Sequence, residues 1–171
     1  NWQGPLRLRP SFTPQSRTPW GGTRIAELYG KELGLPAGER VGEAWVLSLD
    51  PQFPSRVGDA LLSEQMDCAL LVKLLDAAQP LSVQIHPSDD YVGLRPGECG
   101  KPEAWYVVER DPGAGLFLGF REGVGATEVR AALDANADVS QLMHFVPVEP
   151  GDFFLIEAGT PHAIGAGVTL V

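Results

Sequence analysis

Four residues of types that commonly serve as metal ligands occur in three short stretches of this sequence. Gln84 and His86 are two positions apart in LSVQIH, and the alternation of side chains along a strand would place both on one face. Glu103 opens EAWYVV, and His162 follows a glycine and proline turn in EAGTPHAIG. Two imidazoles, a carboxylate and an amide oxygen suit zinc or another borderline divalent ion. These residue types predict a metal site, and the spacing leaves open whether the four side chains meet.

Each of these residues also has an ordinary interpretation. A single histidine in a strand is more often solvated or hydrogen-bonded than a ligand, and this applies to His86 taken alone. The same interpretation is kept for His144, which stands between apolar neighbours in MHFV without a second candidate ligand nearby. Asp89 and Asp90 follow a proline and are typical of a solvated turn. The predicted site therefore depends on the combination of four residues.

Composition limits the class of protein. A chain of 171 residues with 44% hydrophobic and 20% charged residues predicts one globular domain over residues 1–171. The net charge of −9 argues against nucleic acid and anionic membrane as partners. Two cysteines, Cys68 and Cys99, without a C-x-x-C spacing argue against a disulfide scaffold or a cysteine zinc site. No apolar run has transmembrane length and no leader is evident, so the cytoplasm is the expected compartment.

The elements that would position the four residues are mostly strands. Twenty glycines and fifteen prolines favour many short strands joined by turns, as in a sandwich or barrel. We expect strands over 43–49, 69–77, 81–86, 103–109, 115–120, 143–148, 152–158 and 167–171. Helices are expected over 24–34, with helical spacing at Ile25, Leu28 and Tyr29, and over 127–135 and 138–145, with Thr127 and Asp138 as N-caps. The segment 55–66 is interpreted as helix or loop.

Three stretches of the sequence resemble one known family. LSVQIHPSDDY, GKPEAWYVV and GDFFLIEAGTPHAIGAGV resemble the signature stretches of the type I phosphomannose isomerases, a metal-dependent branch of the cupin superfamily. Residues 151–162 also resemble the second cupin motif, G-x(5)-P-x-G-x(2)-H, with Glu157 in place of the proline. PLRLRPSFTPQSRTPWGG and GEAWVLS resemble the opening segment of the family, so the similarity covers most of the chain.

The resemblance implies a fold, a cofactor and an activity. The fold would be a cupin-type jelly-roll barrel, mainly β with a few short helices. It would hold one Zn²⁺ per chain, or another divalent ion, through Gln84, His86, Glu103 and His162. The activity would be that of a mannose-6-phosphate isomerase, an aldose–ketose isomerase that interconverts mannose 6-phosphate and fructose 6-phosphate through an enediol(ate). The partner would be this small sugar phosphate, and a monomer is the favoured state.

The resemblance also assigns residues around the metal. The family's lysine beside the metal glutamate corresponds to Lys101, and its serine before the metal glutamine to Ser82; both are assigned to substrate handling. Lys101 and Glu103 are the catalytic candidates, because the negative charge of an enediolate must be stabilised where it develops. Lys101 as a solvated loop lysine is the alternative. Arg95 and Lys101 are the candidates for the phosphate, which needs cationic partners.

This chain also departs from the family pattern. Type I enzymes continue past this stretch into strands that carry a catalytic arginine, whereas the sequence stops at Val171. We therefore expect the N-terminal part of a longer enzyme, with the last strands of its barrel lacking and an open edge; completion by another chain is the alternative. A non-catalytic, metal-containing cupin that binds sugar phosphate is the alternative function. A metal-dependent cupin oxygenase is disfavoured by Gln84 in place of a histidine and by Lys101 beside Glu103.

Overall fold

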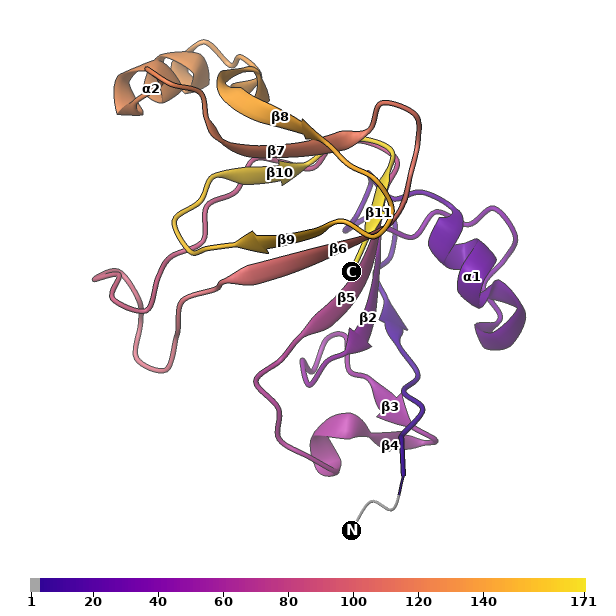
Figure 1. Ribbon diagram of the computed structural model, residues 1–171. Coiled ribbons are helices and arrows are strands. Elements are labelled where there is room, and N and C mark those ends of the chain that lie inside the picture. The colour runs from indigo at the N-terminus through magenta and orange to yellow at the C-terminus, as the bar shows by residue number, and fades with distance from the viewer. Residues whose placement is uncertain (1–3) are drawn as a thin grey trace. The chain divides into compact units, whose positions relative to one another are not determined.

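The computed structural model describes residues 4–171, which form short strands with few helices (Figure 1). The chain divides into two compact units, one comprising the residues up to Ala78 together with Thr169–Val171, the other Gln79–Val168. None of the helices within residues 4–171 is long and apolar enough to cross a membrane. The prediction of a mainly β protein is confirmed, and the single domain and the jelly-roll closure stay predictions.

In the first unit, four strands lie side by side in the order β1, β2, β5 and β11. Their bounds are Ser11–Phe12, Glu43–Leu47, Val72–Ala77 and Val168–Leu170. The neighbours β1 and β2 pair antiparallel, as do β2 and β5. The segment interpreted as helix or loop forms a small hairpin, β3 (Arg56–Val57) and β4 (Ala60–Leu61), followed by the 3-10 helix η1 (Leu62–Glu64).

Helix α1 (Arg24–Leu33) covers the core of this unit. Ile25 is fully buried against Val41, Ala44 and Leu74, and Tyr29 packs against the same cluster. The helix ends at Gly34, whose φ of 72° lies in the left-handed region that glycine adopts without steric cost. The predicted helix is thus confirmed, although Leu28, one of the three apolar residues in its pattern, is 65% exposed.

A buried carboxylate closes the N-terminus of α1. Asp76 on β5 is only 1% exposed, and its Oδ2 accepts a hydrogen bond of 2.8 Å from the backbone N–H of Arg24. Its Oδ1 accepts from the Thr169 hydroxyl at 3.2 Å and lies 3.5 Å from the Arg24 guanidinium. Because Thr23 makes no side-chain capping bond, Asp76 takes the place of the usual cap, where a negative charge also meets the positive end of the helix dipole.

Asp76 gives this unit a specific pH dependence. Burial raises the pKa of the Asp76 carboxyl above its ordinary value of 3.8, and Arg24 and Thr169 offset part of the rise. Because the unfolded chain then releases this proton at a lower pH than the folded one, ionisation favours unfolding. The free energy of unfolding of the wild type, relative to Asp76→Asn, should fall as the pH rises from about 3.8 through the raised pKa and then level off. Urea unfolding of both proteins across this range measures it, and a difference that rises with pH contradicts the assignment.

The second unit contains two sheets and a short helical excursion. One sheet pairs β6 (Glu103–Arg110) with β9 (Phe153–Ile156), and the other has the order β10, β7, β8. The latter strands are His162–Ile164, Gly115–Phe120 and Met143–Pro147, and the excursion between β7 and β8 contains α2 (Ala126–Asp134) and the 3-10 helix η2 (Val139–Leu142). Figure 1 shows that the chain turns from β9, which lies beside β6, directly into β10, which lies beside β7.

The N-cap predicted for one helix of this unit is confirmed, and the N-cap predicted for the other is wrong. Asp138 accepts the backbone N–H of Ser140 and caps η2, as expected, although the helix stops at Leu142 and the chain continues as β8. The N-cap of α2 is Gly125 and not Thr127, so that prediction is wrong. The Glu128 carboxylate accepts the Gly125 N–H at 2.8 Å, and this bond sets the earlier start.

Candidate metal centre

Three of the four predicted ligands meet inside the second unit. The ligand atoms of His86, Glu103 and His162 all lie within 4.8 Å of one another. The distance from His86 Nε2 to Glu103 Oε1 is 3.4 Å, and that from His162 Nε2 to Glu103 Oε2 is 3.6 Å. Two ligand atoms bound at about 2.1 Å to one tetrahedral ion lie about 3.4 Å apart. The donor types and their spacing therefore fit a zinc-sized ion.

Regular strand geometry aims two of these side chains. Glu103 is the first residue of β6, and the alternation along the strand puts Trp105 and Val107 on the same, buried face. His162 is the first residue of β10, lies opposite Leu118 of β7, and is only 3% exposed. Each ligand thus stands at the end of a strand whose following residues pack in the interior.

The His162 ring is fixed by contacts on two sides. Its Nδ1 lies 2.8 Å from the backbone oxygen of Thr160, so Nδ1–H donates there and leaves Nε2 facing Glu103 as an acceptor. The ring of Trp105 meets His162 edge-on, with centroids 5.4 Å apart. These two contacts prepare Nε2 for metal binding, and neither contact was predicted from the sequence. The i+2 spacing of Trp105 from Glu103 was the available signal.

Gln84 joins the cluster through backbone pairing. Gln84 and His162 form an isolated antiparallel bridge in which each N–H donates to the other's carbonyl at 2.9 Å. Residues directly opposite in such a pair direct their side chains to the same face. The Gln84 amide lies 3.5 Å from the hydroxyl of Ser82, and both side chains are exposed. The backbone bridge thus places Gln84 opposite His162, with its amide exposed to solvent.

The predicted strand over 81–86 is not regular. Only Leu81 and Gln84 donate backbone hydrogen bonds to the segment 162–164, and Ile85, an apolar residue of the alternating pattern, is 56% exposed. The segment stands between two prolines, which cannot donate to a ladder. His86 is held instead through its carbonyl, which accepts from the N–H of Gly159 at 2.7 Å. Gly159 has a φ of 85°, so a glycine is needed at the turn that links both histidine segments.

Lys101 borders the carboxylate of the cluster. Its Nζ lies 2.8 Å from Glu103 Oε1 and 3.4 Å from His86 Nε2, while about half of its side chain (52%) remains exposed. Lys101 is thus an exposed loop lysine, as in the alternative, but it is ion-paired to Glu103, and its role toward a substrate stays a prediction. A cation with one side on the cluster and the other in solvent is placed to meet an anionic ligand as it enters.

The local charges favour a neutral His86. Desolvation lowers the pKa of the His86 imidazole below its ordinary value of 6.5, and the positive charge of Lys101 lowers it further, against the opposing effect of Glu103. The neutral imidazole is the form that binds metal ions. The surroundings of His86 thus favour its ligand form at neutral pH.

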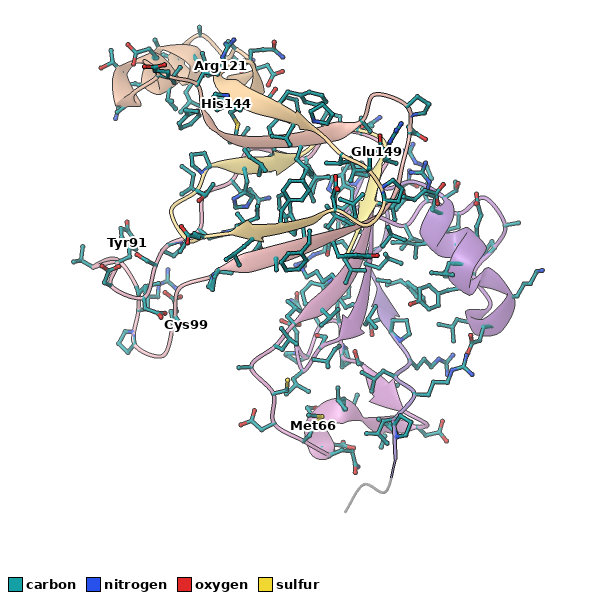
Figure 2. All side chains as sticks on the ribbon, in the orientation of Figure 1. Met66, Tyr91, Cys99, Arg121, His144 and Glu149 are labelled. Atoms are coloured by element: carbon teal, nitrogen blue, oxygen red, sulfur yellow. The ribbon has the colours of Figure 1, made fainter. Side chains whose placement is uncertain are left out.

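Two cationic or imidazole candidates lie outside the cluster. Arg95 stands in an exposed turn whose N–H donates to Glu98 Oε2 at 2.8 Å, and within residues 4–171 no hydrogen bond or ion pair joins it to another predicted site residue. Figure 2 shows Tyr91 and Cys99, which flank this turn, on a loop that extends away from the strands. His144 is exposed on β8 and takes no part in the cluster. The substrate role of Arg95 stays a prediction without a supporting contact.

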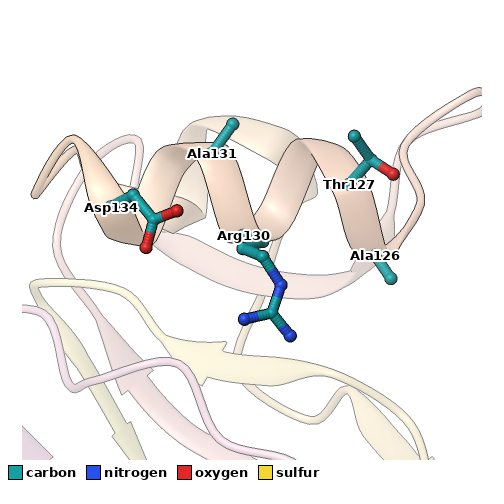
Figure 3. A pocket seen from close by; sticks show the side chains of 5 residues that line it. All are labelled: Ala126, Thr127, Arg130, Ala131 and Asp134. Atoms are coloured by element: carbon teal, nitrogen blue, oxygen red, sulfur yellow. The ribbon is translucent and has the colours of Figure 1, made fainter.

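A shallow hollow occurs elsewhere in the same unit. It lies on the surface of α2 and is lined by Ala126, Thr127, Arg130, Ala131 and Asp134 (Figure 3). None of the predicted ligands or substrate-binding residues lines it. The candidate metal centre is therefore defined by its donor atoms and not by this hollow.

The fold and the cluster together describe one class of protein. Its members are mainly β and carry two histidines and a carboxylate close together near the ends of antiparallel strands. No protein-family model matches the chain. The mannose-6-phosphate isomerase of Streptococcus mutans is 35% identical over 170 residues, which are 89% of this chain and 52% of that protein. Mannose-6-phosphate isomerase ManA of Bacillus subtilis is 33% identical over 183 residues, or 96% of this chain and 55% of that protein.

A solved structure agrees with these relatives. The crystal structure of the mannose 6-phosphate isomerase from Bacillus subtilis superposes with a TM-score of 0.77 at 29% identity, over 98% of this chain and 57% of that one. The chain is a homologue of the mannose-6-phosphate isomerases, and the resemblance inferred from its sequence is confirmed. It spans about half the length of the curated relatives it matches.

Proposed function

We propose that the protein interconverts mannose 6-phosphate and fructose 6-phosphate as a metal-dependent aldose–ketose isomerase. The observation that carries the proposal is the convergence of His86, Glu103 and His162 with Lys101 at their edge, in a homologue of proteins named for this reaction. The antiparallel pairing of β6 with β9 and of β7 with β8 and β10 supports a cupin-type jelly-roll barrel as the scaffold.

The cofactor in this proposal is one zinc ion per chain. Gln84, His86, Glu103 and His162 would hold it, since they supply one carboxylate and three neutral donors. A zinc ion bound in this way supplies a Lewis acid and a template for the sugar oxygens. The rest of the proposed mechanism belongs to side chains of this chain.

Lys101 and Glu103 act together in that mechanism. Isomerisation moves a proton between C1 and C2 of the open-chain sugar, so negative charge develops on the adjacent oxygens as the enediol(ate) forms. The Lys101 ammonium donates a hydrogen bond to such an oxygen and stabilises the charge. Glu103 Oε1, which lies 2.8 Å from Lys101 Nζ, orients the ammonium before the substrate binds. Ser82, beside Gln84, is the proposed donor to a polar group of the substrate.

Metal removal tests the proposed function. Treatment with a chelator is expected to abolish conversion of mannose 6-phosphate, and one equivalent of zinc per chain to restore it, because the charge-stabilising site depends on the ion. A coupled assay for fructose 6-phosphate measures turnover, and elemental analysis measures zinc.

Two results of this experiment contradict the proposal in different ways. Undiminished turnover by demonstrably zinc-free protein contradicts metal dependence. Zinc-loaded protein that binds mannose 6-phosphate in calorimetry but never converts it supports the non-catalytic sugar-phosphate-binding cupin instead.

A further inference from the structure

The two segments that adjoin the candidate ligands are tied together at the base of a loop. Pro87 directly follows His86, and its carbonyl accepts the backbone N–H of Lys101 at 3.0 Å. Between them the chain makes an excursion over 88–100 that contains its own turns, closed by the N–H groups of Tyr91, Leu94 and Glu98. The placement of Lys101 thus depends on how this excursion closes.

Asp89 makes the second tie at this base. Its Oδ1 accepts the backbone N–H of Gly100 at 2.7 Å, a hydrogen bond strengthened by the charge on the carboxylate. Gly100 has no room for a side chain, since a Cβ there would lie 2.7 Å from the nitrogen of Asp89 and from the carbonyl carbon of Ser88. The two backbones therefore touch directly, and the Asp89 carboxylate bridges them.

The neighbouring acid has a different partner. The Asp90 carboxylate accepts from the Ser88 hydroxyl within the same turn and makes no bond to the 99–101 segment. Both aspartates are exposed, and their sequence position alone is typical of a solvated turn. Beside the backbone bond from Lys101 to the Pro87 carbonyl, Asp89 is the only described side chain whose hydrogen bond connects the segment after His86 to the segment that carries Lys101.

We propose that Asp89 is a positioning residue that acts through Gly100 to hold the Lys101 ammonium against Glu103 and His86. This inference rests on the proposed isomerase function for its kinetic consequence, but not for its structural one. The distances of 2.8 and 3.4 Å from Lys101 Nζ to its two partners require the 99–101 backbone to stay in register with 87–89. A displacement of about 1 Å in a group that acts on the substrate can cost about 100-fold in rate.

The test compares four zinc-loaded proteins: wild type, Asp89→Ala, Asp89→Asn and Asp90→Ala. Asp89→Ala is expected to lower kcat by about 10- to 100-fold with a smaller change in KM, because the ammonium is misplaced and not removed. Asp89→Asn keeps an oxygen for the Gly100 N–H and should restore kcat to within about threefold of wild type. Asp90→Ala, the matched control, should behave as wild type. Zinc affinity should be the same in all four.

A second readout does not depend on turnover. Lys101 is labelled with an amine-reactive reagent and its modification rate is measured by mass spectrometry. The rate should rise in Asp89→Ala, in which the ammonium is released from Glu103, and stay low in Asp89→Asn and Asp90→Ala. In a Lys101→Ala background, the further change Asp89→Ala should leave the residual kcat unaltered, because the two residues act as one unit.

The outcomes separate the two proposals. If the wild type has no turnover while Lys101 labelling follows the expected order, the isomerase function fails and the positioning role of Asp89 is supported. Equal labelling of Lys101 in wild type and Asp89→Ala overturns the positioning role, whatever the activity. Should Asp89→Ala fold poorly, Gly100→Ala breaks the same contact from the other side and must raise Lys101 labelling for the proposal to stand.

Discussion

Replacing His162 with alanine should reduce zinc affinity by more than about 100-fold, because loss of an outer partner of a ligand alone costs 10- to 100-fold. His162 is 3% exposed, its Nε2 faces Glu103, and its Nδ1 is held by the Thr160 carbonyl. His86→Ala should have the same effect, and turnover should be lost together with zinc. Chelator competition measures the affinity, and elemental analysis the bound zinc.

Controls for this prediction come from the third histidine and from stability. His144 is exposed on β8, so His144→Ala should bind zinc as tightly as wild type. The buried His162 also packs against Trp105, so thermal unfolding of His162→Ala is needed to show that the variant is folded. His86→Ala lacks this complication, because the histidine is only partly buried. Unchanged zinc affinity in both folded variants rules out the proposed ligand set.

The strands were predictable where local pattern and tertiary packing agree. Residues 115–120 form β7 with the expected bounds. Residues 103–110 form β6, whose aromatic and β-branched side chains point in turn to the buried and the exposed face of the sheet. The segment 81–86 shows the same alternation but receives too few ladder hydrogen bonds to become a strand. Alternation reports which side chains could share a face, and only the partner segment decides whether a ladder forms.

The candidate ligands were predictable because their side-chain types are uncommon together and occur beside turns. The sequence could not predict how the ligands are oriented. Thr160 fixes the His162 tautomer through its backbone carbonyl. Gly159 and Gly100 allow their contacts because they have no side chain. None of these three contacts depends on a side-chain type that the sequence could reveal. Asp89 carries a signal, but it is shared with every exposed turn aspartate. The contacts of Gly159 with His86 and of Gly100 with Asp89 depend on pairing between separate segments, which no local pattern encodes.

The second large effect is expected at Lys101. Lys101→Met keeps the length and the apolar stem of the side chain but removes its charge, so the enediol(ate) oxygen loses its hydrogen-bond donor and its counter-charge. Removal of one such preorganised donor costs roughly 100- to 1,000-fold in kcat. Zinc should stay bound, because the ligand atoms of His86, Glu103 and His162 are untouched. Coupled-assay kinetics on zinc-loaded protein measure the loss.

Two further variants decide whether charge alone or its position matters. Lys101→Arg keeps the charge, but a planar guanidinium cannot occupy the same point beside Glu103, so only part of the activity should return. Lys31→Met removes an exposed lysine of α1 and should leave kcat unchanged, which controls for the loss of one positive charge from an acidic protein. If zinc-loaded Lys101→Met keeps kcat within about threefold of wild type, the ammonium does not stabilise the developing charge, and the bound metal ion would have to do so without it.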